Sequence, residues 1–351
     1  MFLCLSSGAR ERYRKDVILA LAMPKGLRLQ FRYSTQWVDP VVLQGIREKG
    51  HKKTKALICY IDQYDKSKVP KVIPCRYALV VDSEIHGTTV VVTFDLGDFA
   101  HAQDLASFND EVRGHPGNKT PTVGQDGMIA GYYCADMGDW QPQSIQMSAD
   151  VSMWEQVVTQ ISPRSDFSRE TVFYVVEAIR SVSGHKKAGT KNGFFRLKPA
   201  STYEFEIYHF HPTSGVDKAF LRLQAFGASV ALTSNPRITM DSRYDVKRMR
   251  FTTSRPTAPE MAVLSVYRGG ESNIEETKEP DFDIHLRIAG TWGRKLIVGV
   301  LFGVVLAAPN VCAALCNTGL DPKAISAIIV VSAVAGIVAG LIAAFGLKSG
   351  T

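Results

Sequence analysis

The sequence lacks the short motifs that identify a reaction. It contains no Gly-x-Ser-x-Gly segment, which argues against the nucleophile elbow of an α/β hydrolase. None of its six cysteines belongs to a Cys-x-x-Cys pair, and those outside the apolar tail lie far apart, which argues against a zinc site. We therefore expect no metal and no other cofactor.

Acidic residues are scarce at the beginning of the chain. Residues 1–55 contain twelve Lys and Arg but only four Asp and Glu, whereas the whole chain has a net charge of +7. Such a basic segment suits anionic headgroups, nucleic acid or nucleotides, and the alternative is a solvated extension. We interpret residues 1–23 as a basic N-terminal leader.

Charge is almost missing from residues 291–351, which hold two uncharged runs at 296–316 and 324–347. A helix of about 20 apolar residues spans about 30 Å of hydrocarbon. A polar turn with glycine and proline separates the two runs. We predict a C-terminal two-helix transmembrane hairpin, with a pair of buried helices in a soluble core as the alternative.

The residues around and within these runs predict orientation and assembly. Basic residues flank the hairpin on its outer sides, which places the N-terminal region in the cytoplasm of a two-pass membrane protein. Small residues four apart favour close helix packing, either within one hairpin or in a homo-oligomer. The helix-packing candidates are Gly299, Gly303, Gly336 and Gly340.

Residues 24–290 are rich in short β-branched and aromatic runs separated by Gly, Pro, Asn and Asp. Tyr203, Phe205 and Ile207 alternate with glutamates, as in a half-buried strand. One helix is expected near 151–161. The chain is therefore predicted to be mainly β, with two tandem β-sandwich or barrel-like domains at 24–163 and 164–290, followed by the hairpin.

A possible internal repeat supports two related domains. The tetrapeptide Gly-His-Lys-Lys occurs at 50–53 and again at 184–187, and each copy follows a Val-Val pair and an Ile-Arg pair. Similar apolar strands follow at 128–133 and 261–266. Duplication explains the pattern, and chance recurrence of a basic tetrapeptide is the alternative.

The two basic loops are the candidate anion-binding sites. Lysine side chains and the backbone amides of glycine-rich loops bind phosphate, although neither loop has the P-loop spacing. The competing interpretation is a solvated hairpin tip. The candidate residues are His51, Lys52, Lys53, Lys55, His185, Lys186, Lys187 and Lys191.

Two histidines provide the weak candidates for metal binding. His209 and His211 share one face of a predicted strand, where two histidines at the end of a core face are the simpler interpretation. Asp95, Asp98 and His101 follow another strand, where turn chemistry accounts for them equally well. These residues leave catalysis possible but unsupported.

The leading functional hypothesis is a membrane-anchored binding or sensor protein without catalytic activity. Its tandem β-domains would recognise a nucleotide, nucleic acid, another anionic ligand or a protein partner. They would control an oligomerising hairpin in the lipid bilayer, as in a signalling or cell-defence effector. The alternatives are a tail-anchored scaffold for another protein and a membrane-surface enzyme acting on lipid or nucleotide.

Overall fold

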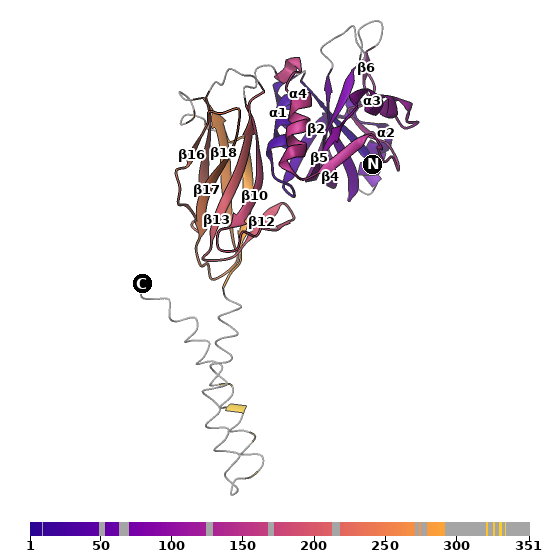
Figure 1. Ribbon diagram of the computed structural model, residues 1–351. Helices are drawn as coiled ribbons and strands as arrows, with labels where there is room; N and C mark the ends of the chain where they lie inside the picture. The colour runs from indigo at the N-terminus through magenta and orange to yellow at the C-terminus, as the bar shows by residue number, and fades with distance from the viewer. Residues whose placement is uncertain are drawn as a thin grey trace. The chain divides into compact units, whose positions relative to one another are not determined.

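The computed structural model describes residues 1–8, 10–48, 53–62, 70–123, 129–167, 172–212, 218–270, 274, 279–291, 321, 326, 330, 331 and 334 (Figure 1). The chain divides into two compact units. The first comprises Met1–Leu197, Ser201–Thr253 and Met261–Arg287. It contains an α/β region, residues 1–167, and a β region from residue 172 onward.

The α/β region is built on one mixed sheet with strand order β2-β5-β4-β3-β1-β8, to which β9 adds by pairing with β5. Strands β1 and β3 are parallel, and the other neighbours are antiparallel. The strands are β1 (Phe2–Ser7), β2 (Arg28–Ser34), β3 (Thr54–Asp62), β4 (Lys71–His86), β5 (Thr89–Ala102), β8 (Cys134–Asp136) and β9 (Ile145–Ser148), with a separate pair β6 (Thr122–Val123) and β7 (Ile129–Ala130).

Helices cover this sheet because each carries one apolar face. Helices α1 (Glu11–Ala22) and α4 (Val151–Ile161) share a buried cluster with Tyr60 and Phe99 of the sheet. Helix α3 (Leu105–Gly114) contributes Phe108 to a second cluster with β1 and β3. The shorter elements are α2 (Pro40–Glu48) and the 3₁₀ turns η1 (Thr35–Trp37) and η2 (Ser165–Phe167).

The segment that follows β2 returns to the opposite end of the strand order. Val38 and Cys134 form a β-bridge, and the Asp39 amide donates to the Cys134 carbonyl at 2.9 Å. The Tyr133 amide donates to the Trp37 carbonyl at 2.8 Å. We call this junction of η1 with β8 the seam.

The β region has the two facing layers of a sandwich, β10-β13-β17-β15 and β11-β12-β19-β18-β14-β16. Alternation is clearest in β19, where every second residue from Phe282 to Ile288 is buried. The strands are β10 (Phe173–Ser181), β11 (Thr190–Lys191), β12 (Phe194–Leu197), β13 (Thr202–Phe210), β14 (Ala219–Phe226), β15 (Val230–Leu232), β16 (Arg237–Met240), β17 (Tyr244–Thr253), β18 (Glu260–Gly269) and β19 (Phe282–Ile288).

The second unit comprises Lys198–Ala200, Ser254–Glu260 and the chain from Ile288 to Thr351. Among its described residues, the Ala200 amide donates to the Ser254 carbonyl at 2.9 Å, and the Thr291 amide donates to the Pro256 carbonyl at 3.0 Å.

The prediction of a mainly β chain with several sheets is confirmed, but residues 1–23 do not form a separate leader. Residues 2–7 form a buried strand between β3 and β8, and α1 packs Val17, Ile18 and Leu21 into the core. The basic residues of the segment, such as Arg12 and Lys15, occupy the exposed side of α1. The segment is therefore an amphipathic part of an α/β fold, whereas the β-sandwich expected after it is present only in the β region.

The two copies of the expected repeat adopt different structures. Val41 and Val42 lie in helix α2, but Val175 and Val176 lie in strand β10. Asp39 and Pro40 explain the difference, because proline suits the first turn of a helix and the Asp39 carboxylate accepts from the Val41 amide at 3.1 Å. The structure therefore gives no support to duplication.

The described fold also corrects the predicted transmembrane hairpin. No helix within the described residues is long and apolar enough to cross a membrane. Even α1, with 12 residues, is about 18 Å long, which falls short of the hydrocarbon thickness of about 30 Å. The predicted spans 296–316 and 324–347, including Gly299, Gly303, Gly336 and Gly340, lie almost entirely outside the described residues. Membrane localisation, which was inferred from the same spans, stays a prediction.

Candidate functional site

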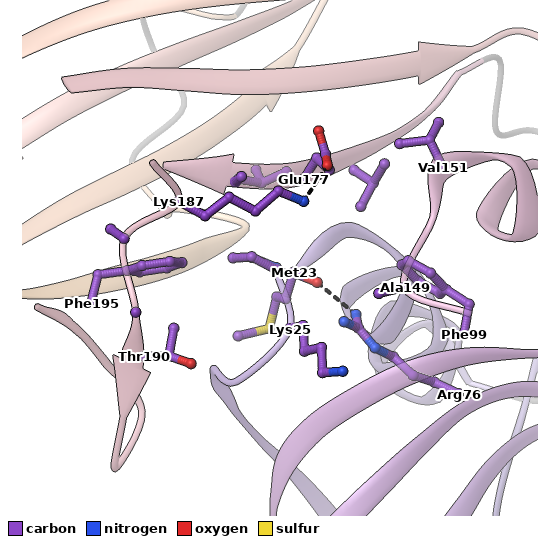
Figure 2. A pocket seen from close by; sticks show the side chains of 16 residues that line it. Met23, Lys25, Arg76, Phe99, Ala149, Val151, Glu177, Lys187, Thr190 and Phe195 are labelled. Carbon is purple, nitrogen blue, oxygen red and sulfur yellow. Dashed lines mark hydrogen bonds and ion pairs between the residues drawn. The ribbon is translucent and has the colours of Figure 1, made fainter. Parts of the chain in front are cut away.

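A pocket of about 260 Å³ brings Lys187 of the second basic loop together with residues of the α/β region. Figure 2 shows Lys187 and Glu177 bordering the same space as Lys25 and Arg76. Of these four residues, Lys25 follows α1, Arg76 lies in β4, Glu177 lies in β10 and Lys187 lies in the loop before β11. We call this space the Arg76 pocket.

Arg76 is the most unusual residue of the pocket, since its side chain is almost fully buried at 1% exposure. Its Nε donates to the Gly97 carbonyl at 2.9 Å. Its Nη1 donates to the carbonyls of Ala20 and Met23 at 2.7 and 2.6 Å. Ala20 and Met23 belong to the last turn and the C-cap of α1, where carbonyls have no helical partner. Arg76 thus caps the helix and interacts favourably with the negative end of its dipole.

The cation of Arg76 has no ion-pair partner in the part of the chain that the structure describes. Its hydrogen bonds go to neutral carbonyls, its Cζ lies 4.4 Å from the centre of the Phe99 ring, and Nη2 makes no hydrogen bond to a described residue. Burial lowers the pKa of Arg76 to about 9 and the charge of Asp98 opposes this effect, so the guanidinium remains charged at neutral pH. A buried cation with only partial compensation favours the entry of an anion.

Two lysines add positive charge at the rim of the pocket. Lys25 pairs with Asp98 at 2.7 Å, and Lys187 pairs with Glu177 at 2.6 Å. Both lysine side chains are more than half exposed, so these pairs exchange readily with solvent or with an incoming ligand. Among the described residues that line the pocket, Glu177 is the single carboxylate, and Arg180 also holds it at 3.2 Å.

The remaining walls of the pocket are apolar. Met23, Phe99 and Val151 border it on the α/β side, and Phe195 borders it on the β side (Figure 2). Val175 of β10 also lines it. The described lining contains no histidine, cysteine or serine. This composition suits recognition of a small anion with an apolar part, since it offers charge and surface but no activated nucleophile.

The structure brings only part of the predicted anion-binding set to this pocket. Lys187 lines it, whereas His185 and Lys186 are exposed in the turn after β10, and Lys191 is exposed in β11. His185 has φ of 51°, in the left-handed region. The loop therefore contributes one lysine and the backbone from Ala188 to Thr190 rather than a cluster of cations.

The described residues of the first basic loop, Lys53 and Lys55, do not line the Arg76 pocket. His51 and Lys52 lie outside the described residues. The Lys53 amide donates to the Val80 carbonyl at 2.7 Å, and Lys55 lies in β3, bordering a different pocket with Tyr77 and Trp140. The described lysines of the two loops therefore border different pockets.

The two histidines behave as core residues. His209 and His211 are both fully buried, with ring centres 5.6 Å apart, and Nε2 of His209 lies 3.1 Å from the Ser242 carbonyl. Burial lowers the pKa of His209, which favours its neutral form. No group of three or more potential metal ligands occurs in the described part of the chain.

The acidic candidates are engaged in ion pairs at the surface of β5. Asp95 pairs with Arg28 at 3.2 Å, and Asp98 pairs with Lys25 at 2.7 Å. His101 is buried, and burial lowers its pKa. These contacts match turn and strand chemistry rather than a catalytic group.

Sequence reasoning missed Arg76, although a signal for it was present. The residue interrupts an otherwise apolar strand from Val72 to Val81 in which proline and cysteine are its neighbours. A charged side chain inside such a run is expected to have a specific partner. The partners, however, are carbonyls of α1 more than fifty residues earlier in the chain, and local pattern does not reveal them.

Comparison with known proteins gives no family for this chain: no protein-family model and no curated protein matches it. Many solved structures are similar to parts of it, among them the following three. WR4, a C. elegans MSP family member, has 6% identity, a TM-score of 0.19, and covers 27% of this chain and 91% of its own. SSP-19, an MSP-domain-like protein of Caenorhabditis elegans, has 12% identity, a TM-score of 0.20, and covers 27% and 91%. A FixG-related protein from Vibrio parahaemolyticus has 12% identity, a TM-score of 0.18, and covers 26% and 80%. Scores this low carry no inference about function.

Proposed function

We propose that the first unit is a binding module for a small organic anion, which it holds in the Arg76 pocket. The observation that carries the proposal is the buried guanidinium of Arg76, which lines a pocket and makes its hydrogen bonds to carbonyls, with the charge of Asp98 compensating it only in part. A phosphate or carboxylate group of the ligand would supply the missing counter-charge. Charge-assisted hydrogen bonds of this kind are about twice as strong as neutral ones.

The shape and lining of the pocket limit the ligand further. A volume of about 260 Å³ is below the range of about 300–1,000 Å³ that is usual for drug-sized ligands. Phe99, Phe195 and Met23 provide apolar contacts for the rest of the molecule. The ligand class is therefore a small phosphate monoester or free carboxylate with a compact apolar group, and the role that we propose is binding.

Calorimetric titration of the full chain with phenyl phosphate, inorganic phosphate and benzoate tests this proposal. We expect phenyl phosphate to bind more tightly than inorganic phosphate, and the affinity to fall as ionic strength rises. Lys187→Gln should weaken binding of phenyl phosphate by about tenfold, which corresponds to about 1.4 kcal/mol. Arg76→Lys should weaken it further, because a lysine cannot reproduce the planar donor geometry.

Lys186→Gln is the matched control, since Lys186 lies beside Lys187 on the same exposed loop but does not line the pocket. Its affinity should stay within about twofold of the unmodified chain. Thermal midpoints of all variants establish that they fold. The proposal is wrong if none of the three anions binds, or if Lys187→Gln and Lys186→Gln, both folded, bind phenyl phosphate equally well.

A further inference from the structure

Strand β8 places two cysteines side by side at the seam. Cys4 in β1 and Cys134 in β8 are directly opposite each other in the antiparallel register of the two strands. Their Sγ atoms lie 4.0 Å apart, and both thiols are free and fully buried. We call these two residues the seam dithiol.

The backbone around the seam dithiol has the geometry that a disulfide needs. The Leu5 amide donates to the Tyr133 carbonyl at 2.7 Å. Because hydrogen-bonded and non-hydrogen-bonded pairs alternate along an antiparallel ladder, Cys4 and Cys134 form a non-hydrogen-bonded pair. The Cα atoms of such a pair are about 4.5 Å apart, within the range of about 4.4–6.8 Å that a disulfide spans. Rotation of the two side chains can therefore bring the sulfurs to bonding distance.

The other two described cysteines are not placed to react with each other. Cys59 in β3 packs in the cluster that includes α3, whereas Cys75 in β4 packs in the cluster that includes α1 and α4. Their side chains thus lie on opposite faces of the sheet. Among the cysteines that the structure describes, the seam dithiol is therefore the pair that the fold positions for a bond.

A cavity of about 250 Å³ gives a small oxidant a place beside the seam dithiol. Leu5 and Tyr133, which are chain neighbours of the two cysteines, line this cavity together with Tyr33. The Tyr33 hydroxyl is hydrogen-bonded to the Cys4 thiol, so one side chain joins the cavity wall to the dithiol. Hydrogen peroxide is little larger than water, and a water molecule needs only about 10–15 Å³ of such a cavity.

The surroundings of the seam dithiol make it slow to react while the two strands stay paired. The hydrogen bond with Cys4, and then burial, raise the pKa of Cys134 well above its ordinary value, so this sulfur is protonated at neutral pH. The thiolate is the reactive form, and thiols buried in apolar surroundings react slowly. Strand β8 has three residues and is the last strand in the order, so we expect its local opening to precede the reaction.

We propose that Cys4 and Cys134 are a modification site at which hydrogen peroxide forms a disulfide that joins β1 to β8. One sulfur attacks the peroxide, the O–O bond breaks, and a sulfenic acid and water form. The second sulfur then attacks the sulfenic sulfur, the S–S bond forms, and another water molecule leaves. Two thiols and one peroxide thus give one disulfide and two water molecules, and the two electrons lost by sulfur reduce the peroxide. The site is independent of the Arg76 pocket, with which it shares no residue.

The disulfide should have a measurable effect on stability. It would join two positions that are 130 residues apart in the sequence. A disulfide stabilises a fold mainly by restricting the unfolded chain, and the effect grows with the length of the closed loop. Oxidation should therefore raise the thermal midpoint by about 5–15 °C. Dithiothreitol should reverse this rise.

The test treats the full chain with hydrogen peroxide, blocks the remaining thiols with iodoacetamide, and maps proteolytic peptides by mass spectrometry without reduction. We expect the peptide with Cys4 to be linked to the peptide with Cys134, and dithiothreitol to separate them. Urea below the unfolding transition should accelerate formation of the link, because it favours opening of β8. Cys59 and Cys75 should not become linked to each other.

Two variants connect the link to the change in stability. Cys134→Ala should abolish both the linked peptide and the reversible rise in thermal midpoint. Cys75→Ala is the matched control, since Cys75 is also fully buried in the α/β region, and it should retain both. Peptide mapping of the unsubstituted chain decides the matter even if Cys134→Ala does not fold.

Three results would overturn the proposal. The first is that Cys4 and Cys134 stay unlinked in peroxide both with and without urea. The second is that they are oxidised separately to sulfinic acids. The third is that either of them forms its disulfide with another cysteine instead.

Discussion

Asp16 on α1 provides a sharp test of the electrostatics of the α/β region. Its carboxyl faces a cleft of about 1000 Å³ that Arg12 and Arg32 also line. Burial raises the pKa of Asp16 from 3.8 to about 7, and the charges of Arg12, Arg32 and Lys15 oppose this effect only in part. The folded chain therefore holds a proton on Asp16 at pH values where the unfolded chain has lost it.

The sign of the pH dependence follows from this difference. Because the pKa of Asp16 is raised in the fold, its contribution to stability is fully present below pH 3.8 and is lost as the pH rises towards 7. The two pKa values correspond to a loss of at most about 4 kcal/mol. Since the side chain is only partly buried, solvent screening reduces the expected loss to about 2 kcal/mol.

Asp16→Asn mimics the protonated carboxyl and should remove this loss. We expect the variant to be about 2 kcal/mol more stable than the unmodified chain at pH 8 and nearly equal to it at pH 4. Urea denaturation at several pH values measures the difference. Glu11→Gln, at the exposed start of the same helix, is the control and should show no comparable gain. A difference between Asp16→Asn and the unmodified chain that is the same at pH 4 and pH 8 would refute the reasoning.

Two other substitutions test the core. Burial lowers the pKa of His209, so the unfolded chain takes up a proton on this histidine before the folded chain does. The free energy of unfolding should therefore fall as the pH drops below about 6.5. His209→Phe should reduce this fall in thermal midpoints measured from pH 7 to 5, and an unchanged slope would contradict the assignment. Trp154 is fully buried in the cluster that α4 forms with α1 and β10. Trp154→Ala should therefore lower the free energy of unfolding, measured by urea denaturation, by about 3–5 kcal/mol. Gln156→Ala, at an exposed position of the same helix, should lower it by less than about 0.5 kcal/mol.

Local patterns were sufficient for elements whose burial follows a short period. The alternation of Tyr203, Phe205 and Ile207 correctly predicted the buried face of β13, and the helix expected at 151–161 coincides with α4. In both cases the apolar residues recur with the period of the element itself. Tertiary contacts are not needed to recognise such a pattern.

The α/β region was misjudged because its organisation depends on distant pairing. Strand β1 is too short to be identified alone, and it is stabilised by parallel pairing with β3, which lies about fifty residues later. The composition of residues 1–23 indicated a basic leader, although apolar residues follow the basic ones. In the structure residues 11–22 form α1, whose charged side is exposed and whose apolar side is buried.

The candidate binding sites also depend on contacts between residues that are distant in the sequence. A basic tetrapeptide is visible in sequence, but exposed lysines such as Lys186 bind weakly unless a buried partner joins them. The buried positive charge of the Arg76 pocket comes from a guanidinium whose hydrogen-bond partners lie on another element. Similarly, Trp37 and Tyr133 lie far apart in the sequence, and only the seam brings their rings together.

Helix α1 positions the Arg76 pocket, because its last carbonyls receive the Arg76 guanidinium. The helix dipole makes this end favourable for cations. The helix therefore holds a cation that can in turn bind an anion. The segment that composition alone marked as a leader is thus the element on which the proposed binding function depends.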